Sequence, residues 1–181
     1  MTAPELGTLD WRPAADHAEL LAEPVRAAVA ALGLEAFAAP VDPELADTAA
    51  FCTAYQVPLA ASANCVVVAG RRGETTRTAA CLVLATDRAD VNGVVRRHLD
   101  VRKISFAPVA EAVARSGMAF GGITPVGLPA DWPVLVDEAV AATPWLVVGS
   151  GTRSSKLLVR GAVLAGLPGA EALTLRQGAV G

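Results

Sequence analysis

Aromatic, charged and metal-binding residues are scarce in this sequence of 181 residues. Aromatic side chains make up 4% of it and charged ones 18%, and only two histidines and three cysteines occur. Cys52, Cys65 and Cys81 have no CxxC spacing, so neither a disulfide framework nor a zinc site is indicated. A GxSxG elbow, a GxGxxG fingerprint and a P-loop lysine motif are also missing. We therefore expect reduced, packed thiols, no metal and no cofactor.

Long hydrophobic runs are missing as well. The most apolar stretch, residues 59–70, is interrupted by Ser62 and Asn64, and no run approaches the ~18–20 apolar residues that a membrane-spanning helix needs. The first ten residues, MTAPELGTLD, carry acids where a secretory signal begins with basic residues. These features favour a cytoplasmic protein with no membrane partner.

Hydrophobic residues are nevertheless abundant, at 53% with a mean hydropathy of +0.44. A chain of this length can bury a core of its own, since single domains commonly run about 100–200 residues. We expect an N-terminal arm over residues 1–15 and one domain over residues 16–181, with fraying of residues 1–15 and 176–181.

Charge is distributed unevenly around a formal total of −3. Acids dominate residues 1–50, whereas residues 71–103 carry eight Lys and Arg side chains against four acids. A basic middle segment permits a phosphate or nucleic-acid ligand. The charge pattern alone slightly favours the other interpretation, in which residues 71–103 form a solvated face with ordinary ion pairs.

The hydrophobic pattern predicts helices and strands without regular βαβ alternation. Helices are expected after Pro24, after Asp47 or Thr48, after Asp90, after Pro108 and over residues 162–167. Strands are expected over residues 34–39, 64–69, 78–85, 103–106, 134–136, 145–148 and 157–159. Of these, 64–69 and 78–85 flank a Gly-Arg-Arg-Gly turn and are expected to pair as an antiparallel hairpin. The predicted fold class is α+β, a single compact domain with a mixed, largely antiparallel sheet flanked by helices.

Two glycine-containing segments are candidates for chemistry. In residues 121–129, GGITPVGLP, glycines permit close approach of the backbone and prolines fix its path. Such a loop can direct N–H groups at a carbonyl that becomes negative in a transition state, although composition alone favours a structural loop. Residues 149–156, GSGTRSSK, suit either a small anion-binding nest or a tight turn.

The same loop carries a family resemblance. GGITPVGLP, followed by Asp137 in VLVDEAV, resembles the signature of the YbaK and prolyl-tRNA-synthetase-associated domain family of aminoacyl-tRNA deacylases. The resemblance extends from about Val25 to Leu167 and includes SANCVVVA, DVRKISFAP and GSGTRSSKLLV. It implies a compact mixed α/β domain, here freestanding, that hydrolyses wrongly charged aminoacyl-tRNA. The implied partners are the acceptor end of tRNA and, as a further candidate, an aminoacyl-tRNA synthetase.

One position departs from the family pattern. The family has a functional lysine on the strand after the Thr48 helix, and the aligned residue here is Asn64. Losing a hydrogen bond to a charged group, worth roughly 1.5–3 kcal/mol, weakens binding or catalysis by about 10- to 100-fold. Lys103, Arg153 and Lys156 are candidates to supply the charge from another element. Asn64 alternatively satisfies backbone groups inside the sheet.

Each candidate site residue has an expected role. Backbone N–H groups around residues 122–127 are expected to polarise the ester, Asn64 to orient the substrate amine, water or phosphate, and Asp137 to brace the loop or contact the amino group. Thr48 and Asp137 suit helix caps equally well. The residues expected to act in catalysis are Asn64, Gly122, Thr124, Pro125, Gly127 and Asp137. Those expected to bind substrate are Thr48, Phe51, Lys103, Ser105, Gly149, Gly151 and Arg153.

Two other functions stay open at this point. In one, the chain has kept the pocket and lost the lysine, and is a noncatalytic binding module for aminoacyl-tRNA or a small aminoacyl ligand. Alternatively, it is a hydrolase for another small activated ester or amide.

Overall fold

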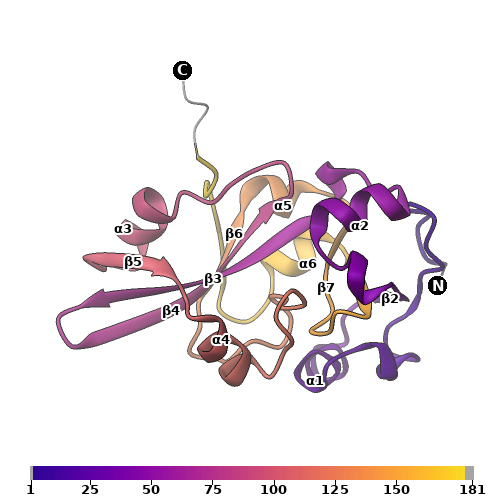
Figure 1. The fold of residues 1–181 in the computed structure, drawn as a ribbon, viewed down its shortest axis with the longest axis horizontal. Coiled ribbons are helices and arrows are strands. Elements are labelled where there is room, and N and C mark those ends of the chain that lie inside the picture. Colours follow the sequence, from indigo (N-terminus) through magenta and orange to yellow (C-terminus); the bar gives the residue numbers. More distant parts are fainter. Residues whose placement is uncertain (1, 178–181) are drawn as a thin grey trace.

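The strands form two sheets in the computed structural model, which describes residues 2–177 (Figure 1). One sheet has the order β5-β3-β4-β6-β9 and the other the order β1-β2-β8-β7. All pairings are antiparallel except β4 with β6 and β6 with β9. The strands are β1 (Arg12–Pro13), β2 (Ala36–Pro40), β3 (Ala63–Arg72), β4 (Thr75–Leu84), β5 (Lys103–Phe106), β6 (Val134–Asp137), β7 (Leu146–Gly149), β8 (Ser155–Val159) and β9 (Ala170–Leu173).

Short helices cover these sheets. They are α1 (Glu23–Leu32), α2 (Thr48–Tyr55), α3 (Arg96–His98), α4 (Val109–Ser116), α5 (Glu138–Ala142) and α6 (Gly161–Ala165). The predicted α+β class, with a largely antiparallel arrangement, is confirmed. The division of the strands into two sheets, the short helix α5 and the strand β9 were not anticipated. Within the described residues, no helix is both long and apolar enough to cross a lipid bilayer.

The predicted β3–β4 hairpin is present, but its turn is shorter than expected, because Gly70, Arg71 and Arg72 belong to β3. Ala63 pairs with Leu84 at one end and Arg72 with Thr75 at the other, and Gly73 makes the turn with a φ of +60°. Figure 1 shows the hairpin extending away from the four-stranded sheet. Exposed residues at its tip give way to fully buried ones toward Leu84, so one end is anchored in the core and the other reaches solvent.

Local signals set several helix ends. In α1, Val25 and Val29 are buried and Gly33 ends the helix in the left-handed conformation. The Asp90 carboxylate accepts hydrogen bonds from the backbone N–H groups of Gly93 and Val94, as expected of a cap. The helix that follows is irregular, with a π turn over Val91–Val95 before α3.

The N-terminal arm is folded onto the domain where fraying was expected. Trp11 is 7% exposed, and its indole Nε1 donates to the Leu6 carbonyl at 2.9 Å. Strand β1 pairs with β2, and Ala14 is buried in the main core. The buried apolar surface of Trp11 and Ala14 holds this segment in place. Residues 178–181, also expected to fray, lie outside the described residues.

One edge of β3 is only partly paired, because β5 covers one end of it and β7 of the other sheet meets the opposite end. This edge pairs with β5 from Val68 onward, and the Ala107 N–H donates to the Val67 carbonyl. At the other end, Ser62 forms a bridge with Val147 of β7. No strand of the described chain pairs with this edge over residues 64–66. The resulting gap between β5 and β7 is where the candidate site lies.

Candidate functional site

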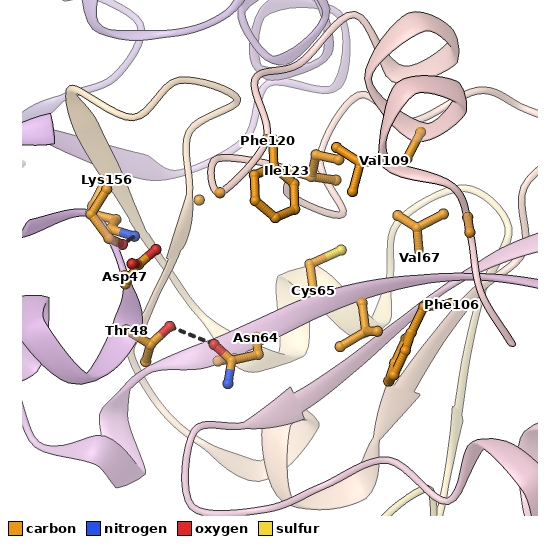
Figure 2. A pocket seen from close by; sticks show the side chains of 17 residues that line it. Asp47, Thr48, Asn64, Cys65, Val67, Phe106, Val109, Phe120, Ile123 and Lys156 are labelled. Carbon is orange, nitrogen blue, oxygen red and sulfur yellow. Dashed lines mark hydrogen bonds between the residues drawn. The ribbon is translucent and has the colours of Figure 1, made fainter. Parts of the chain in front are cut away.

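A cavity of about 330 Å³ occupies this gap (Figure 2). Its lining comes from the start of α2, the first half of β3, the β5–α4 connection and the loop after α4, together with Gly149 and Lys156. One end is polar, with Asp47, Thr48, Asn64 and Lys156, and the other is apolar. An acyl ester joined to a nucleoside likewise has an apolar part and a polar part.

Thr48 and Asn64 are joined at the polar end. The Thr48 hydroxyl donates to Asn64 Oδ1 at 2.6 Å, which leaves the Asn64 amide N–H groups as donors. Asp47 occupies the position before α2 without a side-chain cap bond. The hydroxyl of Thr48 is therefore used to orient Asn64, and the capping role considered for it is not what the structure shows.

Asn64 stands at the border of two cavities. Successive side chains of a strand point to opposite faces, and Ala63 and Cys65 pack toward the main core whereas Val66 packs against another cluster. Asn64 shares the face of Val66 and also lines a neighbouring cavity of about 650 Å³. Its amide thus lies at the edge of the first cavity.

Lys156 is the cation of this site. It is 7% exposed, its ammonium donates to the Ala46 carbonyl at 2.7 Å, and it lies 5.1 Å from the centre of the Phe51 ring. No carboxylate of the described residues lies within 4.0 Å of it. Burial lowers the pKa of Lys156, because removal from water disfavours the charged form. An ammonium has three donors, so two remain for a ligand.

The apolar part of the cavity contains a thiol that is unsuited to attack. Burial raises the pKa of Cys65 far above its usual range, and the nearby Cys81 raises it further. Since the thiolate is the nucleophilic form, Cys65 serves here as wall. The remaining apolar lining includes Val67, Phe106, Val109, Phe120 and Ile123.

The glycine-rich loop contributes only its first part to the cavity. Gly121 and Ile123 line it, and their N–H groups have no acceptor within the described residues. The Gly122 N–H is already donated to the Ala119 carbonyl at 2.9 Å, and the Gly122 carbonyl accepts from Gly151 at 2.8 Å. Gly122 therefore fastens the loop to its neighbour, and the free donors are those of Gly121 and Ile123.

Three other loop residues with an expected catalytic role lie away from the cavity. Thr124 is fully buried, and its hydroxyl has no hydrogen-bond partner in the described structure. Pro125 and Gly127 line a separate apolar hollow beside Trp132. A side chain at Gly127 would lie 2.3 Å from the Pro24 carbonyl oxygen, so this half of the loop packs against α1.

Asp137 has a structural environment. It is 1% exposed, and one carboxylate oxygen accepts from the Ala139 N–H at 2.9 Å, which caps α5. The other accepts from the N–H groups of Leu175 and Arg176 at 2.8 and 3.0 Å. Asp137 does not line the cavity, and its bonds tie β6 to the segment after β9.

The residues expected to bind substrate are divided among several places. Thr48 and Gly149 line the cavity, while Phe51 is 1% exposed beneath Lys156. Arg153 lies at the rim, where it donates to the Pro43 carbonyl at 3.0 Å and is 3.6 Å from Asp47.

The other three lie outside the cavity. Gly151 packs against Ala22 and Val25. Lys103 and Ser105 are exposed on β5, and Ser105 lines the neighbouring cavity.

The hydroxyl-rich turn before Lys156 satisfies its own polar groups. The hydroxyls of Ser150 and Ser155 are 2.7 Å apart, and Thr152 is 3.1 Å from Ser155. Ser155 also donates to the Leu20 carbonyl. Of the two interpretations of residues 149–156, the tight turn fits this network, and the turn delivers Lys156 to the cavity.

Several lining residues carried no clear sequence signal. Phe120 and Val109, which line the cavity, were not singled out. Lys156 did have a signal, because it is a charged residue directly before the apolar run LLV of β8. Within residues 2–177, no group of three or more His, Cys, Asp or Glu side chains is placed to hold a metal ion.

Comparisons with known proteins agree with this architecture. A family model described as "aminoacyl-tRNA editing domain" matches residues 42–167. No curated protein matches the chain. A solved structure of a candidate trans-editing enzyme for prolyl tRNA synthetase superposes with a TM-score of 0.74 at 22% identity, covering 87% of this chain and 97% of the other. The hypothetical protein APE2540 gives 0.75 at 19% identity, with 86% and 100% covered. At these identities the two structures share the fold.

Proposed function

The chain belongs to the aminoacyl-tRNA editing domain family, and on that basis we propose that it hydrolyses the ester bond of mischarged aminoacyl-tRNA. The structurally similar protein described as a candidate trans-editing enzyme for prolyl tRNA synthetase supports the same role. Under this proposal the chain acts in the cytoplasm on the acceptor end of tRNA, alone or together with a synthetase.

The structural observation that supports the proposal most strongly is the buried ammonium of Lys156. Burying an ammonium away from water is costly unless it meets compensating polar groups, and here it has one carbonyl and an aromatic ring. Its two remaining donors suit an oxygen of the substrate, either the ester carbonyl or a phosphate. We assign to Lys156 the charge that the family places on the strand of Asn64.

The reaction needs placement and polarisation rather than a protein nucleophile. A water oxygen attacks the ester carbonyl carbon, and the carbonyl oxygen becomes negative in the tetrahedral intermediate. When the carbon–oxygen ester bond breaks, the ribose oxygen leaves and takes up a proton, and the free amino acid is released. The neighbouring ribose hydroxyl helps to orient the water and to carry the proton.

Three groups of the cavity suit these steps. The free N–H groups of Gly121 and Ile123 and the ammonium of Lys156 are donors for the developing oxyanion. The Asn64 amide, held by Thr48, is placed to orient the ribose or the substrate amine. Cys65 takes no part in the chemistry, because its pKa is raised.

A panel of mischarged tRNAs tests this function. The purified protein is incubated with each tRNA, and release of the amino acid is followed against spontaneous hydrolysis. Turnover of at least one member is expected. Binding without turnover of any member would instead support the noncatalytic binding module, and cleavage of simple aminoacyl esters without any tRNA preference would support the hydrolase of other esters.

Variants of Asn64 separate the two tRNA-binding alternatives. If Asn64 positions substrate in an active enzyme, Asn64→Ala lowers deacylation, whereas Asn64→Lys is no better than the wild type. If the cavity is a degenerate one, Asn64→Lys creates deacylation that the wild type lacks. Thr48→Val, which removes the hydroxyl bonded to Asn64, is expected to match Asn64→Ala in direction with a smaller effect.

A further inference from the structure

Exposed apolar side chains are concentrated at the mouth of the cavity. The described structure has five large hydrophobic residues with substantial exposure, and three of them, Phe106, Val109 and Phe120, line this one cavity. Phe106 is 68% exposed and Phe120 62%. In Figure 2 the two rings lie on different sides of Cys65. Scattered single apolar residues need no explanation, but such a grouping around a pocket marks a binding surface.

The volume of the cavity shows why such a surface is needed. At about 330 Å³ it is at the lower end of the range of ~300–1,000 Å³ for small-molecule sites. The aminoacyl group and its ribose can enter it, whereas the bases of the terminal nucleotides must stay at the rim. Unpaired bases present flat apolar faces, and proteins hold them by stacking on aromatic side chains.

We infer that Phe106 and Phe120 are stacking platforms for the unpaired 3′-terminal nucleotides of the tRNA acceptor end. This inference rests on the proposed function for the identity of the ligand. The two rings are open to solvent, so a base can cover each ring face without displacing other side chains.

An arginine lies beside Gly121, the residue after Phe120, and a second arginine lines a cavity together with Phe106. A side chain built at Gly121, next to Phe120, would lie 2.2 Å from Arg153 Nη1. Arg88 and Phe106 line the neighbouring cavity together, and Arg88 has no ion-pair partner among residues 2–177. A ring with a cation beside it matches a nucleotide, whose base stacks while its phosphate meets the positive charge.

Binding of a short RNA tests the inference independently of turnover. The probe is a fluorescently labelled, uncharged single-stranded RNA with the acceptor-end sequence, titrated with full-length protein at fixed salt. Phe106→Ala and Phe120→Ala are each expected to raise Kd by about 5- to 150-fold, the usual range for loss of one base–aromatic stack. Leu59→Ala is the matched control, since Leu59 is 44% exposed and lies outside both cavities.

A second readout distinguishes bases from the amino-acid side chain as the occupant of the rim. In both variants, kcat/KM for mischarged tRNA is expected to fall by a larger factor than kcat/KM for an aminoacyl methyl ester, which has no base to stack. Equal loss on both substrates would mean that the rings hold the amino-acid side chain, and would overturn the inference. So would RNA affinity that is unchanged in both variants or unmeasurable in the wild type.

The two proposals fail separately. Ring-dependent RNA binding without cleavage of any mischarged tRNA would refute deacylation and leave the stacking surface in place. Cleavage of mischarged tRNA, together with RNA binding that is unchanged in both phenylalanine variants, would refute the stacking surface and leave deacylation in place.

Discussion

At the scale of single residues, Lys156 combines a functional position with a cost in stability. It is buried without a carboxylate partner, and its pKa is lowered from the ordinary value of 10.5 chiefly by loss of hydration. Burying a charge without a counter-charge costs stability, and an apolar side chain of similar volume avoids that cost. We therefore predict that Lys156→Met unfolds in urea at the same or a higher concentration than the wild type at pH 7.

The stability difference between Lys156→Met and the wild type is predicted to depend on pH. Between the lowered folded pKa of Lys156 and 10.5, the unfolded chain binds more protons than the native state, so wild-type stability rises with pH in that interval. Lys156→Met lacks this linkage. Its advantage over the wild type should therefore shrink as the pH rises toward 10.5 and be largest below the folded pKa. A constant difference across the range would show that the ammonium is not desolvated in the native state.

Cys65 provides a second residue-level test. Its thiol lies in the cavity, but burial raises its pKa, so it is protonated at neutral pH and cannot attack the ester. We predict that Cys65→Ala keeps kcat for deacylation within about threefold of the wild type, since only wall packing changes. Complete loss of turnover in a variant that still binds RNA would point to covalent catalysis.

At the scale of elements, the loop of residues 121–129 and the turn of residues 149–156 pack backbone to backbone. A side chain at Gly122 would lie 2.4 Å from the Thr152 carbonyl oxygen, and one at Gly149 would lie 2.4 Å from the Gly122 carbonyl oxygen. Glycine is needed here for close approach and not for an unusual φ at Gly122. This contact fixes the backbone at Gly121 and Ile123, which line the cavity.

Gly122→Ala should separate the two loops. Overpacking of this kind costs typically about 1–3 kcal/mol, and the displaced donors should lower kcat more than they raise KM. The matched control is Gly166→Ala, where the added methyl group meets its nearest atom at 3.4 Å. Both variants are measured by thermal unfolding and by deacylation kinetics. Equal stability and equal kcat in the two variants would show that the contact between the loops does not position the donors.

Asp137 tests the distinction between a structural and a catalytic carboxylate. It accepts three backbone hydrogen bonds that join β6, α5 and the segment after β9. Asp137→Asn places an amide where these N–H donors converge, and hydrogen bonds to a charged group are worth about 1.5–3 kcal/mol. We predict a loss of stability of that order, measured by urea unfolding, with kcat of the folded variant preserved. An unchanged stability with a lost kcat would restore Asp137 to the chemistry.

At the scale of the whole molecule, local patterns predicted local structure well. The apolar, β-branched runs on both sides of a Gly-Arg-Arg-Gly segment predicted the β3–β4 hairpin, and the capping preference of aspartate predicted the helix start at Asp90. The family membership was also predicted from the glycine-proline loop and is confirmed. These signals lie within a few residues of the features they specify.

The cavity depended on contacts that local patterns do not encode. It exists because β3 meets β5 at one end and β7 at the other, and because Lys156 reaches a carbonyl 110 residues away in the sequence. Gly121 and Gly127 belong to one loop, yet one lines the cavity and the other packs against α1. Sequence proximity therefore overestimated how much of the loop faces the substrate.

The most direct test of the account is single-turnover deacylation of one mischarged tRNA by the wild type, Lys156→Met and Lys103→Met. Lys103 is the control because it is an exposed lysine on β5 outside the cavity. We predict that Lys156→Met, folded and binding RNA, cleaves about 10- to 100-fold more slowly, the loss expected for one hydrogen bond from a charged donor, while Lys103→Met cleaves at nearly the wild-type rate. Equal rates for Lys156→Met and the wild type would contradict the assignment of the buried ammonium to the substrate.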